Sequence, residues 1–249
     1  MLTGQSSRKK VIPMKTPLTK EKLQNHLSYS LWKYALLIIV AIFGWNLIFS
    51  VTEHQAPEEK KVVTGVYSYG DHTLLATYME MIRQEYMPDM EEMTCEFVMP
   101  DEAYGAMILS TRVAAREFDI YILPGAEFQN YAALGAFMPL EKVLPGLVTE
   151  LERLGISLSR GNRALEIAVK NDEKPEKAMA AGEKHQFGIP CADLPGMSAM
   201  FQCDTSDMYL CVFYETYNDE NVLKFFERFV RDMLEKPKVV DHTGAQPTQ

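Results

Sequence analysis

The sequence predicts an α/β fold, with a single three-layer lobe and a mostly parallel sheet, preceded by one transmembrane helix. Two observations carry this prediction. An uncharged apolar segment of about 18 residues lies near the amino terminus, roughly the length that crosses a hydrocarbon core as a helix. After it, short runs of β-forming residues alternate with segments of helical periodicity, which is typical of a parallel sheet covered by helices.

The apolar segment, residues 34–51, follows a basic stretch. Residues 1–33 contain seven lysines and arginines and one glutamate, a net charge of +6. The positive-inside rule therefore predicts that residues 1–33 are cytoplasmic and that the chain after residue 51 is extracytoplasmic. A cleaved signal peptide is the alternative, but the basic and apolar regions are long and no small-x-small site follows. No cysteine follows closely, as lipid attachment in the bacterial manner would require. We therefore predict an uncleaved, single-pass anchor in the cell membrane.

The charge balance of the exported part excludes some partners. The whole chain carries −9 and its first 33 residues +6, so the remainder carries −15. Such an acidic domain argues against nucleic acid or anionic lipid as a partner, and is compatible with a cationic or neutral solute. About 190 residues remain outside the membrane, which is enough for one well-packed domain but few for two.

Three strands and three helices are expected in the first part of this domain. The expected strands are residues 62–67, 94–99 and 119–123. The first helix shows apolar residues at helical spacing up to Tyr86 and is stopped by Pro88, and the second runs to about Arg116. The third covers residues 127–134 and is capped by Gly135. Short links between these segments favour parallel neighbours in one sheet.

The candidate site residues lie in the loops that follow the three strands. In a parallel sheet these loops converge, and ligands bind in the crevice beyond the carboxyl ends of the strands. The residues expected there are Tyr69, Asp71, Asp101 and Glu127. A carboxylate can bind a cation or a sugar hydroxyl, and a tyrosine ring can stack on a sugar. The structural alternatives are a helix cap for Asp71, an ordinary loop aromatic for Tyr69, and solvated surface carboxylates for the other two.

The remainder of the chain is less regular. Residues 157–184 are polar and predict a surface excursion, with a weak strand-like alternation at Leu165, Ile167 and Val169. A short strand is expected at residues 185–190. The run MYLCVFY, residues 208–214, is apolar on both faces and predicts a central strand. The last helix is expected to begin at Asn218 or Asp219 and to bury one face.

No motif for catalysis or metal binding is present. The sequence lacks G-x-S-x-G, H-E-x-x-H, phosphate-loop and dinucleotide-binding patterns. Its four cysteines match neither C-x-x-C nor a metal spacing; Cys95 and Cys211 are interpreted as small buried thiols. Cys191 and Cys203 could close a short disulfide in an exported domain, with free thiols as the alternative. We therefore expect no enzyme activity, no metal and no cofactor.

Three segments carry a family resemblance. Residues 114–144, AAREFDIYILPGAEFQNYAALGAFMPLEKVL, resemble the first lobe of bacterial extracellular solute-binding proteins, the type-2 receptors of ABC importers. Asp119 begins the strand, and Phe128 and Tyr131 lie on the short helix that follows it. EKHQFGIP (residues 183–190) and NDENVLKFFERFV (residues 218–230) are similar to two further family segments.

The resemblance implies an extracytoplasmic solute-binding domain associated with an ABC importer. Its ligand would be a small solute such as a sugar, and its partner a transporter permease or another membrane protein. The family has two lobes that close around the solute, whereas here only a short segment separates Pro190 from Met208, so the second lobe is missing. An open lobe predicts weak affinity, on the order of micromolar to millimolar. The alternative is a non-transport ectodomain that uses the lobe as a scaffold for a protein or a cell-wall component.

These predictions divide the chain into five parts. They are a basic cytoplasmic tail (1–33), a transmembrane anchor (34–51), a tether (52–61), an extracytoplasmic solute-binding-protein-like domain (62–236) and a disordered tail (237–249).

Overall fold

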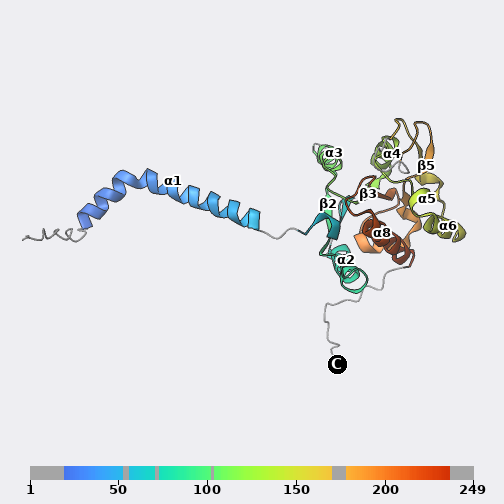
Figure 1. The fold of residues 1–249 in the computed structure, drawn as a ribbon, viewed down its shortest axis with the longest axis horizontal. Coiled ribbons are helices and arrows are strands. Elements are labelled where there is room, and N and C mark those ends of the chain that lie inside the picture. The colour runs from blue at the N-terminus through green and yellow to red at the C-terminus, as the bar shows by residue number, and fades with distance from the viewer. Residues whose placement is uncertain (1–19, 53–55, 71–72, 102–103, 170–177, 236–249) are drawn as a thin grey trace, which may run out of the picture. The chain divides into compact units, whose positions relative to one another are not determined.

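The computed structural model describes five stretches of the chain (Figure 1), residues 20–52, 56–70, 73–101, 104–169 and 178–235. The chain divides into two compact units, residues 1–55 and residues 56–249. The amino-terminal part of the expected cytoplasmic tail, residues 53–55 of the expected tether and the carboxyl-terminal tail lie outside the described residues.

The first unit contains one helix, α1 (Lys20–Thr52), among its described residues. Within α1, the 19 residues Leu31–Phe49 are long and apolar enough to cross a membrane. This agrees with the predicted apolar span. A signal sequence near an amino terminus meets the same criteria of length and composition, and the orientation of the helix remains a prediction.

The second unit is built on a five-stranded sheet with the order β2-β1-β3-β7-β6. Its strands are β1 (Lys61–Tyr67), β2 (Glu92–Val98), β3 (Ile120–Pro124), β6 (Ile189–Pro190) and β7 (Met208–Val212). β1 pairs in parallel with both β2 and β3, while β7 runs antiparallel to β3 and β6. The predicted trio of neighbouring parallel strands is confirmed. The run MYLCVFY does form a central strand, and it is the one strand of this sheet that runs the opposite way.

Helices cover both faces of this sheet, so the lobe has three layers. Side chains alternate along β3: Ile120 and Ile122 join one apolar core, and Tyr121 and Leu123 join the other. Figure 1 shows α2 and α8 on one side of the strands and α3 and α4 on the other. The helices are α2 (Thr73–Glu85), α3 (Gly105–Ala115), α4 (Gly125–Ala133), α5 (Leu140–Val143), α6 (Pro145–Arg153), α7 (Pro195–Phe201) and α8 (Asp219–Leu234).

The expected helix boundaries agree closely with the observed ones. α4 ends at Ala133, and Gly135 has a φ of +72°, the left-handed conformation that a glycine adopts most easily after a helix. Asn218 is the N-cap residue of α8, as predicted. One face of α8 packs against the sheet through apolar side chains that include Phe225, Phe226 and Phe229.

The strand expected at residues 185–190 is in fact two strands in two different sheets. β5 (Lys184–Gln186) pairs antiparallel with β4 (Asn162–Ala164), whereas β6 pairs with β7. Gly188 lies between β5 and β6, where a Cβ would meet the Phe128 ring at 2.7 Å. The backbone therefore passes too close to this ring for any other residue, and the chain leaves one sheet for the other here.

The alternation at Leu165, Ile167 and Val169 does not form the expected strand. β4 ends at Ala164, before this segment begins. Leu165 is buried, Ile167 is 52% exposed, and Val169 pairs with Met179 through an isolated bridge. The described ends of the excursion therefore pair with each other, as β4 with β5 and through the Val169–Met179 bridge, but the predicted residues form no continuous strand.

Asp119 joins three strands at the start of β3. Its backbone N–H donates to the Val63 carbonyl, and its carboxylate accepts the Val63 N–H, both at 2.9 Å. Its carbonyl accepts the Phe213 N–H at 2.8 Å. Burial raises the pKa of Asp119 to about 6, against the opposing effect of the Val63 hydrogen bond.

Candidate functional site

The three parallel strands end level with one another, at an edge that we call the carboxyl edge. Tyr67, the last residue of β1, is in register with Val98, the last residue of β2. Tyr69 follows β1, Asp101 follows β2, and Glu127 lies in the first turn of α4 directly after β3. The topology therefore brings three of the four predicted site residues to this edge. Asp71, the fourth, lies outside the described residues.

A hydrogen bond links the loop that follows β1 to the loop that follows β2. The Tyr69 hydroxyl donates to the Pro100 carbonyl at 2.7 Å. The Tyr69 side chain is nevertheless 62% exposed, and that of Tyr104, just before α3, is 60% exposed. Two aromatic rings at this edge are thus open to solvent and available for stacking.

Tyr67 lies among the candidate residues, and the sequence reasoning missed it. Its ring is buried in the core on the α3 and α4 side of the sheet. Burial raises the pKa of the Tyr67 hydroxyl, and Glu127, Tyr69 and Asp101 raise it further. The three predicted residues follow the ends of β1, β2 and β3, and Tyr67 is the last residue of β1, so all four belong to the same edge of the sheet. Within the described residues this hydroxyl makes no hydrogen bond.

The surroundings of Tyr67 extend to α3 and α4. A Cβ at Gly105, the first residue of α3, would lie 2.9 Å from the Tyr67 hydroxyl oxygen. Burial raises the pKa of Tyr131 on α4, with Glu127 and then Tyr67 adding to the effect. The carboxyl edge thus combines two carboxylates with several phenols. Carboxylates only accept hydrogen bonds and phenol rings present a negative face, so this arrangement suits a solute rich in donors, such as a sugar or an amine.

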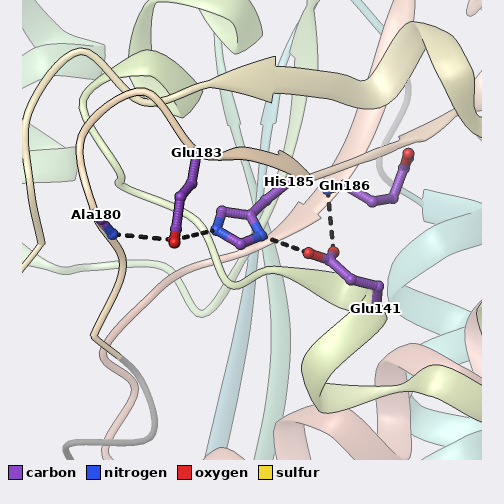
Figure 2. Close-up of polar contacts among 5 residues, drawn as sticks. All are labelled: Glu141, Ala180, Glu183, His185 and Gln186. Carbon is purple, nitrogen blue, oxygen red and sulfur yellow. Dashed lines mark hydrogen bonds and ion pairs between the residues drawn. The ribbon is translucent and has the colours of Figure 1, made fainter.

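A second polar cluster, which we call the His185 network, joins α5 to β5 (Figure 2). His185 Nδ1 lies 2.6 Å from Glu141 Oε1, and Nε2 lies 3.2 Å from Glu183 Oε2. Glu141 Oε2 accepts the Gln186 N–H at 3.0 Å, and Glu183 Oε2 accepts the Ala180 N–H at 3.1 Å. The Ala180 N–H, followed by His185, lowers the pKa of Glu183.

The His185 network is better suited to holding the fold together than to chemistry. The His185 side chain is only 9% exposed, and each ring nitrogen faces a carboxylate. An imidazole that acts as a general base needs a free nitrogen within reach of a substrate. With both nitrogens occupied, His185 instead fixes the excursion to α5. No local sequence pattern indicates this contact, because Glu141 and His185 are 44 residues apart.

A hollow of about 530 Å³ lies beside this network, between α6 and the β4–β5 hairpin. Val148, Ile156 and Leu158 supply apolar surface, and Glu152 and Lys184 supply opposite charges. The sequence reasoning did not predict this hollow, because its lining comes from segments that are distant along the chain.

The structure gives no sign of a metal or disulfide site in the part it describes. Across the described ranges, no group of three or more His, Cys, Asp or Glu side chains is placed to hold a metal ion. All four cysteines are free, so the disulfide considered for Cys191 and Cys203 does not form. Cys211 is buried as predicted, whereas Cys95 is half-buried; burial raises the pKa of Cys95 to about 11.

Comparison with known proteins yields little. No family model matches the chain, and no curated protein matches it. One solved structure to which it is similar is the extracellular solute-binding protein family 1 from Alicyclobacillus acidocaldarius, with 19% sequence identity and a TM-score of 0.31. That match covers 52% of this chain and 27% of the other, so this chain spans about a quarter of that protein. A similarity this slight carries no argument about function.

Proposed function

We propose that this protein is a membrane-anchored, extracytoplasmic solute-binding protein-like domain associated with an ABC importer, with a small solute such as a sugar as its ligand. The observation that carries the proposal is that Tyr69, Asp101 and Glu127 follow three neighbouring parallel strands, whose carboxyl ends lie at one edge of the sheet beside Tyr67. Aromatic rings and hydrogen-bonding groups that converge at this edge are what a donor-rich solute needs. The resemblance of three sequence segments to the family supports the same function.

The proposed affinity is weak. Tyr69 and Tyr104 are exposed, so a bound solute would stay in contact with water on one side. Solvent contact reduces both the apolar area buried and the strength of each hydrogen bond. We therefore expect dissociation constants on the order of micromolar to millimolar.

A ligand screen on the full-length chain in detergent tests this function. Thermal unfolding would be followed with sugars, oligosaccharides, amino acids and peptides, because a ligand that binds the folded state raises its unfolding temperature. Calorimetry on the hit would then compare wild type with Tyr69→Ala, Asp71→Ala and Asp101→Asn. Glu166→Gln is the matched control, since Glu166 is exposed and lies outside the carboxyl edge. Unchanged binding in all three variants would move the site elsewhere.

The proposed anchor and orientation are open to a separate test. Leu31–Phe49 is apolar enough to span a membrane, and basic residues precede it. Protease added to intact cells should digest the acidic domain and leave a small membrane-bound fragment. Recovery of the acidic domain from the medium, cleaved after the apolar segment, would instead show a signal sequence.

A protein-binding scaffold is the second candidate, and one surface favours it. Met99, Met107 and Ile108, at and before α3, are 65%, 60% and 41% exposed. The Met99 backbone lies beside Gly105, the first residue of α3, and exposed apolar side chains on neighbouring segments often mark an interaction site. A photo-crosslinker at position 107 in the native membrane should capture a defined partner other than an importer subunit if the lobe is a scaffold. For a solute-binding domain without such a partner, the crosslinking pattern should match that of a crosslinker placed at exposed Glu166.

We also propose that the domain is not an enzyme. His185, the one histidine with close carboxylate partners among the described residues, has both ring nitrogens occupied. If the domain binds its ligand without catalysing a reaction, the ligand is recovered chemically unchanged. Mass spectrometry of the screened ligand after prolonged incubation with the protein would reveal any conversion.

A further inference from the structure

We propose that the hollow beside the His185 network is a second binding site, and that it takes a short zwitterionic peptide with apolar side chains. None of its lining residues belongs to the carboxyl edge, so it does not depend on the solute proposed above. Its volume of about 530 Å³ lies within the range of sites that bury small ligands. It is larger than a single amino acid requires and fits a di- or tripeptide.

The apolar part of the lining favours apolar side chains. Val148 and Ile156 are half-buried and retain apolar surface at the hollow. Leu158 also lines the hollow but is buried. All three pack against the core on the α2 and α8 side of the sheet. Covering such surface with an aliphatic side chain is favourable by about 25 cal/mol per Å² of apolar area removed from water.

The charged part of the lining favours a molecule that carries both signs. Glu152, in the last turn of α6, and Lys184, on β5, both line the hollow. Neither forms an ion pair with any residue that the structure describes, although ion pairs are frequent elsewhere on this surface. An ammonium group would pair with Glu152 and a carboxylate with Lys184, and a peptide with free termini supplies one of each.

The wall beneath these groups is held rigidly. Glu141 and Gln186 line the hollow. Glu141 is fixed by His185 and by the Gln186 N–H, and the Gln186 side chain donates to the Gly188 carbonyl. Asn162 pairs with Gln186 across the β4–β5 ladder and adds an amide to the lining. A site whose wall needs no rearrangement loses little free energy when a ligand binds.

Calorimetry on the full-length chain in detergent tests the proposal with four peptides. Leucyl-leucine should bind, and its N-acetylated and C-amidated forms should each bind about tenfold more weakly, because each has lost one charge-assisted hydrogen bond. Glycyl-glycine, which has both charges but no apolar side chain, should bind more weakly as well. Absence of leucyl-leucine binding at millimolar concentration, or equal binding of the free and blocked forms, would overturn the proposal.

Two variants assign each charge to its partner. The Glu152→Gln variant should bind free and N-acetylated leucyl-leucine with equal affinity. The Lys184→Gln variant should bind free and C-amidated leucyl-leucine with equal affinity. Both positions are exposed, so both variants should fold, which the far-UV circular dichroism spectrum checks. Glu166→Gln is the control and should leave all four affinities unchanged.

A third variant separates this site from the carboxyl edge. Tyr69→Ala should leave leucyl-leucine binding unchanged, whereas it should weaken binding of the solute proposed for the edge. Loss of leucyl-leucine binding in Tyr69→Ala, with unchanged binding in Glu152→Gln, would show that the peptide binds at the edge and would overturn the second site. A screen that finds no solute sensitive to Tyr69→Ala would count against the carboxyl edge alone and would leave the peptide result standing.

Discussion

The carboxyl edge and the His185 network differ in how their polar groups are satisfied. In the network both ring nitrogens and both oxygens of Glu141 have partners within the protein, and the His185 side chain is 9% exposed. At the edge the Tyr67 hydroxyl makes no hydrogen bond among the described residues, and the Tyr69 ring is 62% exposed. Polar groups that satisfy one another stabilise the fold, whereas a hydroxyl without a partner in the described part of the chain, as that of Tyr67, can be satisfied by a ligand.

This difference reverses the usual expectation about residue types. A histidine between two glutamates has the composition of a catalytic site, but here it joins α5, β5 and the turn before β5. Tyrosines at the ends of strands have no such composition, but the topology gathers them where ligands bind in open α/β sheets. The partners of the two His185 nitrogens and the hydroxyl of Tyr67, unbonded within the described ranges, more than the chemical type of either residue, therefore separate the His185 network from the candidate site.

Substitution in the network should cause the largest loss of stability. Glu141→Ala removes the acceptor of the Gln186 N–H and a partner of buried His185. Leaving the Gln186 N–H and the Nδ1 of His185 without their partner should lower the free energy of unfolding by about 3 kcal/mol, measured by denaturant unfolding of the full-length chain in detergent. Glu141→Gln keeps an oxygen for the Gln186 N–H and should lose less. If Glu141→Ala unfolds like wild type, the network has no structural role.

Asp119 is a half-buried carboxylate that accepts one N–H, and the stability of the fold should depend on its protonation state. Its carboxylate accepts one N–H, and burial raises its pKa from 3.8 to about 6. The folded state therefore binds a proton more tightly than the unfolded state, so this contribution is fully present below pH 4 and is lost as pH rises through about 6. Asp119→Asn stays neutral and can still accept the Val63 N–H.

The Asp119→Asn variant should therefore gain stability relative to wild type as pH rises. The difference in free energy of unfolding between them should change by about 2 kcal/mol between pH 4 and pH 7, in favour of the variant. The comparison between proteins cancels other groups that titrate over the same range. A difference that stays constant with pH would mean that Asp119 is ionised as easily in the folded as in the unfolded chain.

The fold was predictable where local periodicity decides the structure. The strands that became β1, β2 and β3, and the helices between them, were predicted from patterns within single segments. The apolar run at residues 208–214 predicted burial of β7 but not its direction, because a strand buried on both faces has the same pattern in either direction. The break at Gly188 depends on the Phe128 ring, which is distant along the chain, and no local pattern contains it.

The candidate site was predictable to the extent that topology determines it. Tyr69, Asp101 and Glu127 follow consecutive parallel strands, so their proximity followed from the strand order alone. Tyr67 was missed because its ring completes the apolar face of β1, and only the position of its hydroxyl assigns it to the site. The His185 network and the hollow were missed because each is formed by segments far apart in sequence.

Removal of the Tyr67 hydroxyl should affect binding much more than stability. Tyr67→Phe keeps the buried ring and deletes a hydroxyl that has no hydrogen bond within the described residues, so the free energy of unfolding should change by less than about 0.5 kcal/mol. Calorimetry with the solute found in the screen should show binding about tenfold weaker. Tyr217→Phe, at a tyrosine that is 65% exposed, is the matched control and should leave both quantities unchanged. A large loss of stability in Tyr67→Phe would mean that this hydroxyl stabilises the fold.

Substitution of Tyr69 should have the smallest effect on stability, and it should show whether the ring or the hydroxyl of Tyr69 contributes to solute binding. Tyr69→Phe deletes the hydrogen bond to the Pro100 carbonyl, which lies at the surface, so the free energy of unfolding should fall by less than about 0.5 kcal/mol. The ring remains for stacking, and binding of a sugar should stay within about twofold of wild type, whereas Tyr69→Ala should weaken it about tenfold. Equal losses in both variants would mean that the hydroxyl positions the two loops and that the ring does not contact the solute.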